Sequence, residues 1–180
     1  MSQATVLYRF RIDLSDVDKG VYETLDFRLA LHPSESFLYF LTRALAFSLS
    51  FEPDLQISAG GLSDPDGPSI FVNQINGRTK LWIEIGNPSS KKLHKAAKAS
   101  DHVQVYTYKD AQLIINEAES QQIHNAGQIE IYAFDPKFLE RLAKNLPRDV
   151  RWSVLRNESI LTISAADKSE ETEIKKFSFI

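Results

Sequence analysis

The chain has 180 residues, of which 43% are hydrophobic and 25% charged, and this size and composition predict a single globular domain over residues 1–180. The absence of cysteine excludes disulfides, zinc–thiolate sites and cysteine nucleophiles, and favours a reducing cytoplasm. A net charge of −3 argues against a large nonspecific DNA-binding surface, so any contact with nucleic acid needs a local basic face.

Two alternating segments open the chain. Apolar and polar residues alternate over residues 5–14 and again over residues 21–31, which predicts two strands. Asp16, Asp18 and Gly20 lie between them and are typical turn residues. We therefore expect an N-terminal antiparallel hairpin.

A helix is predicted from Pro33 to about Ser50. Proline suits the first position of a helix, and the early Glu35 favours its positive end. Glu35, Tyr39 and Arg43 repeat at a spacing of one turn. Another side of the same helix carries the expected buried stripe, formed by Phe37, Leu38, Leu41, Ala44 and Leu45.

The next region reads as strands around a long connection. Residues 52–67 are rich in proline and glycine, and predict a short strand at Leu55–Ile57 followed by an irregular loop. Ser69–Val72 and Lys80–Ile85 are predicted strands. The Asn76–Gly77 dipeptide between them indicates a tight hairpin turn.

A helix over Lys91–Ser100 leads into a strand over Val103–Tyr108. A strand, a helix and a strand in this order normally place the two strands parallel with a right-handed crossover. The sheet is therefore expected to centre on Leu81–Ile85.

The last third predicts further strands and helices, and no run in the chain is apolar enough to cross a bilayer, so we expect no membrane role. The expected elements are helices at Ala111–Gln121 and Asp135–Leu146, the latter with Pro136 at its first position, and strands at Gln128–Phe134, Arg151–Leu155, Ser159–Ser164 and a terminal one ending at Phe179.

Glu84 is the residue most in need of an explanation. Alternation along its strand places Glu84 and Trp82 on one face. If both faces are covered, an ionised carboxylate there needs a metal, a cation or hydrogen bonds. The alternative is an exposed end of the sheet, where Glu84 meets water. Buried carboxylates of this kind cluster at functional sites, which favours the first reading.

The helix after this strand is basic. Its wheel places Lys91, Lys95 and Lys98 on the solvated face, which is the ordinary position for lysine. Lys92 and His94 lie nearer the flanks. From there the flexible side chain of Lys92 could reach over the end of the strand toward Glu84.

The histidines and one serine are weaker candidates. His32, His94, His102 and His124 show no metal-ligand spacing. Ser34 next to His32 suggests a nucleophile and a base, but neighbouring residues rarely face each other on a helix, and a capping serine is far commoner.

Four runs carry a family resemblance: His32-Pro33-Ser34-Glu35, Trp82-Ile83-Glu84-Ile85-Gly86-Asn87-Pro88, Lys95-Ala96 and Val105-Tyr106-Thr107-Tyr108. In this order and spacing, over essentially the whole chain, the sequence resembles the YaeQ family. The resemblance implies the fold of the PD-(D/E)xK, or restriction-endonuclease-like, superfamily, and no settled activity. The expected fold is α/β with a mixed sheet: a core of helix, three strands, helix and strand, with an added N-terminal β-hairpin and a C-terminal β-rich extension.

The same resemblance implies roles for particular residues. In those nucleases, acids from the helix and two strands hold magnesium, and a strand lysine positions water and charge. Glu35 matches the helix acid, Pro68 the motif proline and Glu84 the second-strand acid.

The nuclease pattern fails at two positions. Ser69 stands where the first acid is expected, and Gly86 stands where the lysine is expected. Asp64 or Asp66 could replace the acid from the loop. In the same way, Lys92 or Lys95 could replace the lysine from the helix.

Two functions fit this pattern. The first is a Mg²⁺-dependent phosphodiesterase or nuclease in which Glu35, Glu84 and Asp66 hold the ion and Lys92 or Lys95 assists the attacking water. The second is a noncatalytic module on a decayed nuclease fold that binds nucleic acid or another protein. A purely structural role explains the same residues less specifically, and no pattern indicates an oligomeric state.

Overall fold

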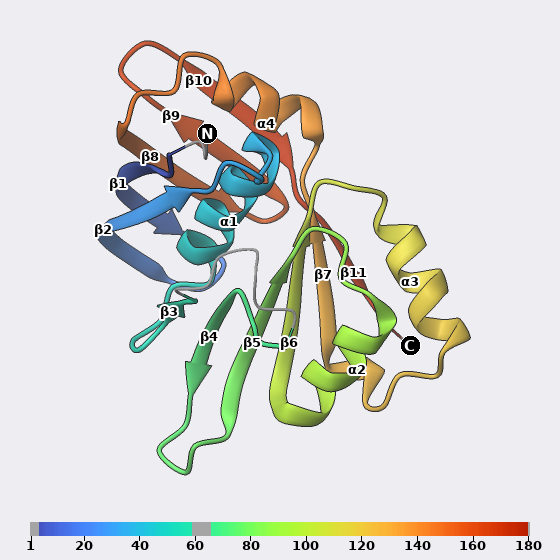
Figure 1. The fold of residues 1–180 in the computed structure, drawn as a ribbon. Coiled ribbons are helices and arrows are strands. Elements are labelled where there is room, and N and C mark those ends of the chain that lie inside the picture. Colours follow the sequence, from blue (N-terminus) through green and yellow to red (C-terminus); the bar gives the residue numbers. More distant parts are fainter. Residues whose placement is uncertain (1–3, 59–65, 180) are drawn as a thin grey trace. The chain divides into compact units, whose positions relative to one another are not determined.

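The computed structural model describes residues 4–58 and 66–179, which form a mixed α/β fold (Figure 1). The chain divides into two compact units, each built from two separate segments: Met1–Leu49 with Phe134–Ile174, and Ser50–Ala133 with Lys175–Ile180. Such a division does not test whether the units fold independently, so the single domain over 1–180 stays a prediction. Among the described residues, no helix is both long and apolar enough to span a membrane.

The first unit contains a mixed sheet with the described strand order β10-β9-β8-β1-β2. β1 pairs antiparallel with β2 along the whole length of both strands, which confirms the predicted N-terminal hairpin. β1 pairs parallel with β8 on its other side. The strands are β1 Val6–Asp16, β2 Val21–Leu31, β8 Asp149–Asn157, β9 Ile160–Ser164 and β10 Ser169–Glu173.

Two helices, α1 (Phe37–Leu49) and α4 (Pro136–Ala143), pack against each other, and against the sheet through β1, β2 and β10. Alternation in β1 directs Phe10, which is fully buried, into an aromatic core. Its ring lies 5.3 Å from that of Phe27, 5.8 Å from Phe40 and 5.6 Å from Trp152. The opposite face of the sheet carries mainly exposed polar side chains.

The start of α1 differs from the prediction. The helix begins at Phe37, not at Pro33, because Ser36 supplies the cap: its hydroxyl accepts the backbone N–H of Tyr39 at 3.1 Å. The preceding residues form a turn closed by a bond of 2.9 Å from the Glu35 N–H to the His32 carbonyl. Glu35 therefore precedes the helix instead of lying in its first turn.

The second unit contains a mixed sheet with the described strand order β11-β7-β6-β5-β4-β3. β4 and β5 are antiparallel, whereas β5, β6 and β7 run parallel, as the strand, helix and strand pattern predicts. β11 returns from the far end of the chain to pair antiparallel with β7. The strands are β3 Gln56–Ile57, β4 Ile70–Asn73, β5 Thr79–Ile85, β6 Ser100–Thr107, β7 Ile129–Ala133 and β11 Lys175–Ser178.

Helices α2 (Ser90–Ala99) and α3 (Ala111–Ser120) pack side by side over this second sheet (Figure 1). Trp82 of β5 and Leu93 of α2 belong to the apolar core beneath them, together with Val103 and Ile114. Along the chain, α1, β3, β4, β5, α2 and β6 follow the expected order of helix, three strands, helix and strand. The relation to the nuclease superfamily itself stays a prediction.

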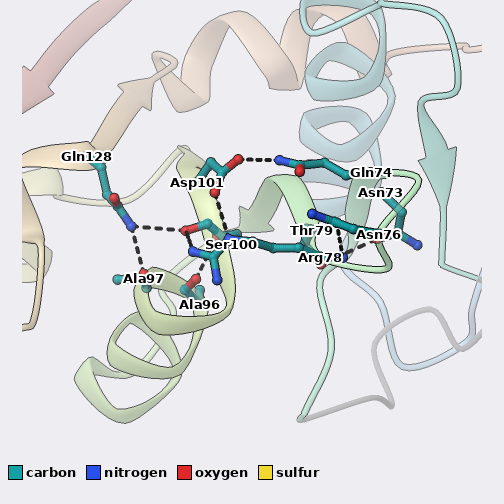
Figure 2. A network of polar contacts seen from close by, with 10 residues as sticks. All are labelled: Asn73, Gln74, Asn76, Arg78, Thr79, Ala96, Ala97, Ser100, Asp101 and Gln128. Atoms are coloured by element: carbon teal, nitrogen blue, oxygen red, sulfur yellow. Dashed lines mark hydrogen bonds and ion pairs between the residues drawn. The ribbon is translucent and has the colours of Figure 1, made fainter.

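The β4–β5 hairpin is tied to the junction of α2 and β6 (Figure 2). Gly77 adopts φ +84°, the left-handed conformation that this turn needs. Arg78 donates to the Asp101 carboxylate at 2.7 Å, and Gln74 donates to the same carboxylate. Gln128 donates to the carbonyls of Ala97 and Ser100 at the end of α2. These bonds fix α2 relative to β5, which matters for the site described below.

Two predictions near the C-terminus need correction. α4 ends at Ala143, before Leu146, because Asn145 takes a left-handed φ of +56°. β10 was not predicted, because the sequence Ser169–Glu173 is wholly polar and buries Thr172 alone among its residues. Its strand conformation comes from pairing with β9.

Candidate functional site

Glu84 is buried, with 3% of its surface exposed, on the face of β5 that it shares with Trp82. The Trp82 indole N–H donates to Glu84 Oε1 at 2.7 Å. The ammonium of Lys92 lies 3.1 Å from Oε2. The exposed-end alternative is therefore wrong: Glu84 is held by a hydrogen bond and by a cation, as a carboxylate in a covered strand requires.

The local sequence explains how Lys92 reaches Glu84. Gly86, at φ +86°, turns the chain out of β5. Ser89 then caps α2, its hydroxyl accepting the backbone N–H of Lys92 at 3.2 Å. Leu93 is buried next to Lys92, so Lys92 lies on the flank of the helix, as predicted. The same φ at Gly86 disfavours a lysine there, which gives a conformational reason for the missing strand lysine.

The side chain of Lys92 is 21% exposed, whereas that of Glu84 is 4% exposed. The pair is thus closed on the carboxylate side and open to solvent on the ammonium side. An ion pair that is partly desolvated gains more from Coulomb attraction than a surface pair, and it costs more to break.

Lys95 and Asp66 come together at the surface of the same unit. Lys95 Nζ lies 3.3 Å from Asp66 Oδ1, with side chains 50% and 81% exposed. A pair this exposed contributes between about 0 and 1 kcal/mol to stability. Lys91 and Lys98 are exposed, as predicted, and Asp64 lies outside the described residues.

Glu35 lies in the first unit, and its side chain is 1% exposed. Arg43 Nη2 is 2.9 Å from its Oε1 and donates to its Oε2 at 3.0 Å. The backbone N–H of His32 donates to Oε2 at 3.1 Å, and Arg43 also donates to the Ala30 carbonyl at 2.7 Å. Burial raises the pKa of Glu35 by more than Arg43 and His32 lower it.

His32 and Ser34 do contact each other, contrary to the prediction. His32 Nδ1 lies 2.7 Å from Ser34 Oγ and also accepts the Ser34 backbone N–H at 3.2 Å. Ser36, not Ser34, caps α1. The hydroxyl and the backbone N–H of Ser34 both contact the same ring nitrogen of His32 within an exposed turn. The contact therefore fits a local turn better than a nucleophile and its base.

The donors near Glu84 fit only one kind of magnesium site. Within residues 4–58 and 66–179, no three Asp, Glu or His side chains gather where they could hold a metal. Mg²⁺ is often held by one or two carboxylates together with waters and substrate phosphates. Glu84 as a single carboxylate suits an ion shared with a substrate but not one held by protein alone, and Asp66 is paired at the surface with Lys95.

Trp82 was considered from the sequence only as a residue that could stack on bases, and its hydrogen bond to Glu84 was not predicted, because an aromatic residue on a strand is usually core. It is core, at 4% exposure, but its indole N–H also orients Glu84. The signal was present in the spacing: residues two apart on a strand share a face, and a buried indole N–H needs an acceptor.

Comparison with known proteins places these residues in a family. The model of the family described as YaeQ protein matches residues 1–174. "Uncharacterized protein YaeQ" of Escherichia coli (strain K12) is 23% identical over 166 residues, with 91% of each chain covered. The protein of the same description from Salmonella typhi is 23% identical over 176 residues, covering 97% of this chain and 96% of that protein.

Solved structures agree with this result. The crystal structure of YaeQ protein from Pseudomonas syringae has a TM-score of 0.88 and 27% identity, with 99% of both chains covered. The structure of YaeQ protein from Xanthomonas axonopodis pv. citri shares the fold, with a TM-score of 0.87 and 24% identity over 97% of this chain and 99% of that one. The chain belongs to the YaeQ family.

Proposed function

We propose that the protein is a magnesium-dependent phosphodiesterase acting on nucleic acid, with Glu84 as its acid and Lys92 as its lysine. The observation that carries this proposal is the 3.1 Å contact between the Lys92 ammonium and the Glu84 carboxylate. It brings together an acid and a lysine although Gly86 leaves the strand position without a charge.

The side chains have distinct tasks in this proposal. Trp82 holds one carboxylate oxygen of Glu84 in place. Lys92, open to solvent on one side, donates to the attacking water or to a phosphate oxygen, whose charge grows in the transition state. Asp66 supplies a second carboxylate and Lys95 a nearby positive charge. When bound, the magnesium ion neutralises phosphate charge and polarises the phosphoryl group.

Glu35 is left out of the proposed metal-binding set. Its carboxylate already has Arg43 as its counter-ion, and its Oε2 accepts hydrogen bonds from Arg43 and from the His32 backbone. Removing the carboxylate from Arg43 would leave a buried guanidinium without a counter-ion. A structural role in the first unit accounts for Glu35 without a metal.

The test uses purified protein with single- and double-stranded DNA and RNA in Mg²⁺ or Mn²⁺. We expect cleavage by the natural sequence. Lys92→Met should lower the rate about 100-fold or more, the size typical of a lost transition-state donor, and Glu84→Gln should lower it to a similar degree because the carboxylate that would hold the ion loses its charge. Lys91→Met, an exposed lysine one residue away, is the matched control and should change the rate little. Cleavage that survives Glu84→Gln unchanged would refute the assignment.

A second candidate is a noncatalytic module that binds nucleic acid or a protein through the same surface. Two observations favour it: both Glu84 oxygens have protein partners, and the described residues offer no three-ligand metal group. This function predicts binding that weakens steeply with salt and is followed by no turnover. A gel shift at low salt without cleavage supports it, whereas no shift and no partner in a pull-down removes it.

A further inference from the structure

Within residues 4–58 and 66–179, β2 pairs with a strand on one side only, that of β1. It lies at the end of the first unit's sheet and spans 11 residues. Its register with β1 is unbroken from Val21 to Leu31, without a bulge. An edge of this length is a template for pairing with another strand unless something protects it.

The other described edges carry such protection. β10, at the opposite edge of the same sheet, has five residues, of which Glu170, Glu171 and Glu173 are acidic. β3 has two residues, and β11 has four, beginning with Lys175 and Lys176. Short strands and like charges are common ways to prevent pairing. β2 has neither.

The charges of β2 suit pairing with itself. On its exposed face lie, in order, Tyr22, Thr24, Asp26, Arg28 and Ala30. If two copies run antiparallel with Phe27 opposite Phe27, Asp26 of each copy faces Arg28 of the other. Asp26 also pairs with Arg9 of its own copy, at 2.6 Å, so Arg28 of the partner would be a second cation for the same carboxylate. If the two-fold axis passes through Asp26 or through Arg28 instead, that residue faces its own copy. Two like charges then lie opposite each other, which is unfavourable.

The covered face agrees with this register. Leu25 and Leu29, which are 4% and 2% exposed, then face each other across the pair. Phe27, which is partly buried, faces its own copy. Arg43 already donates to the Ala30 carbonyl, but a carbonyl oxygen accepts two hydrogen bonds, so the strand is not blocked there.

We propose that β2 is the contact surface for a second copy of this chain, paired antiparallel about Phe27 to join two five-stranded sheets into one. The arrangement has two-fold symmetry, so each contact occurs twice, as is usual in homodimers. Main-chain hydrogen bonds supply affinity, and the Asp26–Arg28 pairs between copies set the register. This inference does not depend on the proposed activity.

Charge reversal tests the partner and the register together. Sedimentation of the natural sequence should give a dimer. Arg28→Asp and Asp26→Arg should each weaken self-association by about 10-fold or more, since two pairs become like-charged. Mixing the two variants restores opposite charges at both pairs and should restore a dimer. Arg151→Asp, on the same face but in the interior strand β8, should leave it intact.

Cysteine cross-linking provides a second readout, because the natural sequence has no cysteine. In this register Thr24 of one copy faces Ala30 of the other, within disulfide range. Thr24→Cys mixed with Ala30→Cys should therefore cross-link under mild oxidation, and Thr24→Cys by itself should not. A monomer in sedimentation, or cross-linking of Thr24→Cys with itself at an equal rate, overturns the proposal.

Discussion

Each compact unit contains a buried carboxylate with a partner cation, and the pairs Glu35–Arg43 and Glu84–Lys92 are built differently. In the first unit, the side chains of Glu35 and Arg43 are 1% and 6% exposed, and Arg43 also holds a backbone carbonyl. In the second unit, Glu84 is equally buried, whereas its partner Lys92 is 21% exposed. The first pair is closed on both sides, and the second is open on one.

This difference separates a structural pair from a candidate functional one. A closed guanidinium–carboxylate pair resists exchange with water or ligand and fixes the turn before α1. An ammonium on a flexible stem, reachable from solvent, can leave its carboxylate for a phosphate or a metal-bound substrate at lower cost. Both acids are buried, so burial of the acid does not distinguish these roles. The exposed fraction of the partner cation does.

The largest expected effect is on the closed pair. Arg43→Ala should lower the free energy of unfolding by about 3–5 kcal/mol, because Glu35 stays buried without its partner. Urea denaturation measures this. The double variant Glu35→Leu with Arg43→Met should recover most of the loss, since no charge is left unpaired. A loss below about 1 kcal/mol for Arg43→Ala would mean that the pair is not closed.

Removal of the cation should lower the free energy of unfolding less in the Glu84–Lys92 pair than in the Glu35–Arg43 pair. Lys92→Ala should cost about 1–2 kcal/mol in urea denaturation, more than a surface pair but less than the closed pair, because water can reach the freed Glu84 from the side that Lys92 leaves open. Its effect on cleavage should greatly exceed its effect on stability. If Lys92→Ala destabilises the protein as much as Arg43→Ala does, the distinction between the two pairs is lost.

The smallest expected effect is on the pH dependence of the free energy of unfolding. Burial raises the pKa of Glu35 above its value in the unfolded chain, so the folded protein binds this proton more readily. The stability contributed by Glu35 is therefore full below the unfolded pKa and is lost as pH rises through the folded one. Urea denaturation at pH values between about 4 and 7 should show this fall in the natural sequence and not in Glu35→Gln.

Glu130 provides the control of opposite sign. Burial raises its pKa, but the Tyr132 hydroxyl, Lys176 and His102 together lower it further than burial raises it. The stability that Glu130 contributes is thus present above the unfolded pKa and lost as pH falls. Glu130→Gln should remove a slope opposite to that of Glu35. If Glu35→Gln and Glu130→Gln change the pH dependence of the free energy of unfolding in the same direction, the opposite roles of Glu35 and Glu130 are contradicted.

Local patterns predicted much of the site. Alternation in β5 placed Glu84 and Trp82 on one face, and the helical wheel placed Lys92 on a flank while Lys91, Lys95 and Lys98 faced solvent. These two periodicities indicated that a lysine of α2 could reach Glu84. Which of Lys92 and Lys95 reaches Glu84 did not follow, because it depends on the capping of α2 by Ser89.

The elements that sequence reasoning missed depend on competition between local signals or on distant partners. Pro33 suggested a helix start, but Ser36 offered a better cap closer to the apolar run. β10 is polar throughout and is a strand because β9 lies beside it. No change in composition marks the border between the two units, so their existence was not predicted.

The two units alternate along the chain, which limits where the chain can be truncated without damage to a sheet. The path runs from the first unit to the second, back to the first, and into the second again, where β11 completes a sheet begun more than a hundred residues earlier. No uninterrupted stretch of gene encodes either half. A truncation just before β11 therefore removes an edge strand from the second unit's sheet and leaves the segments of the first unit whole.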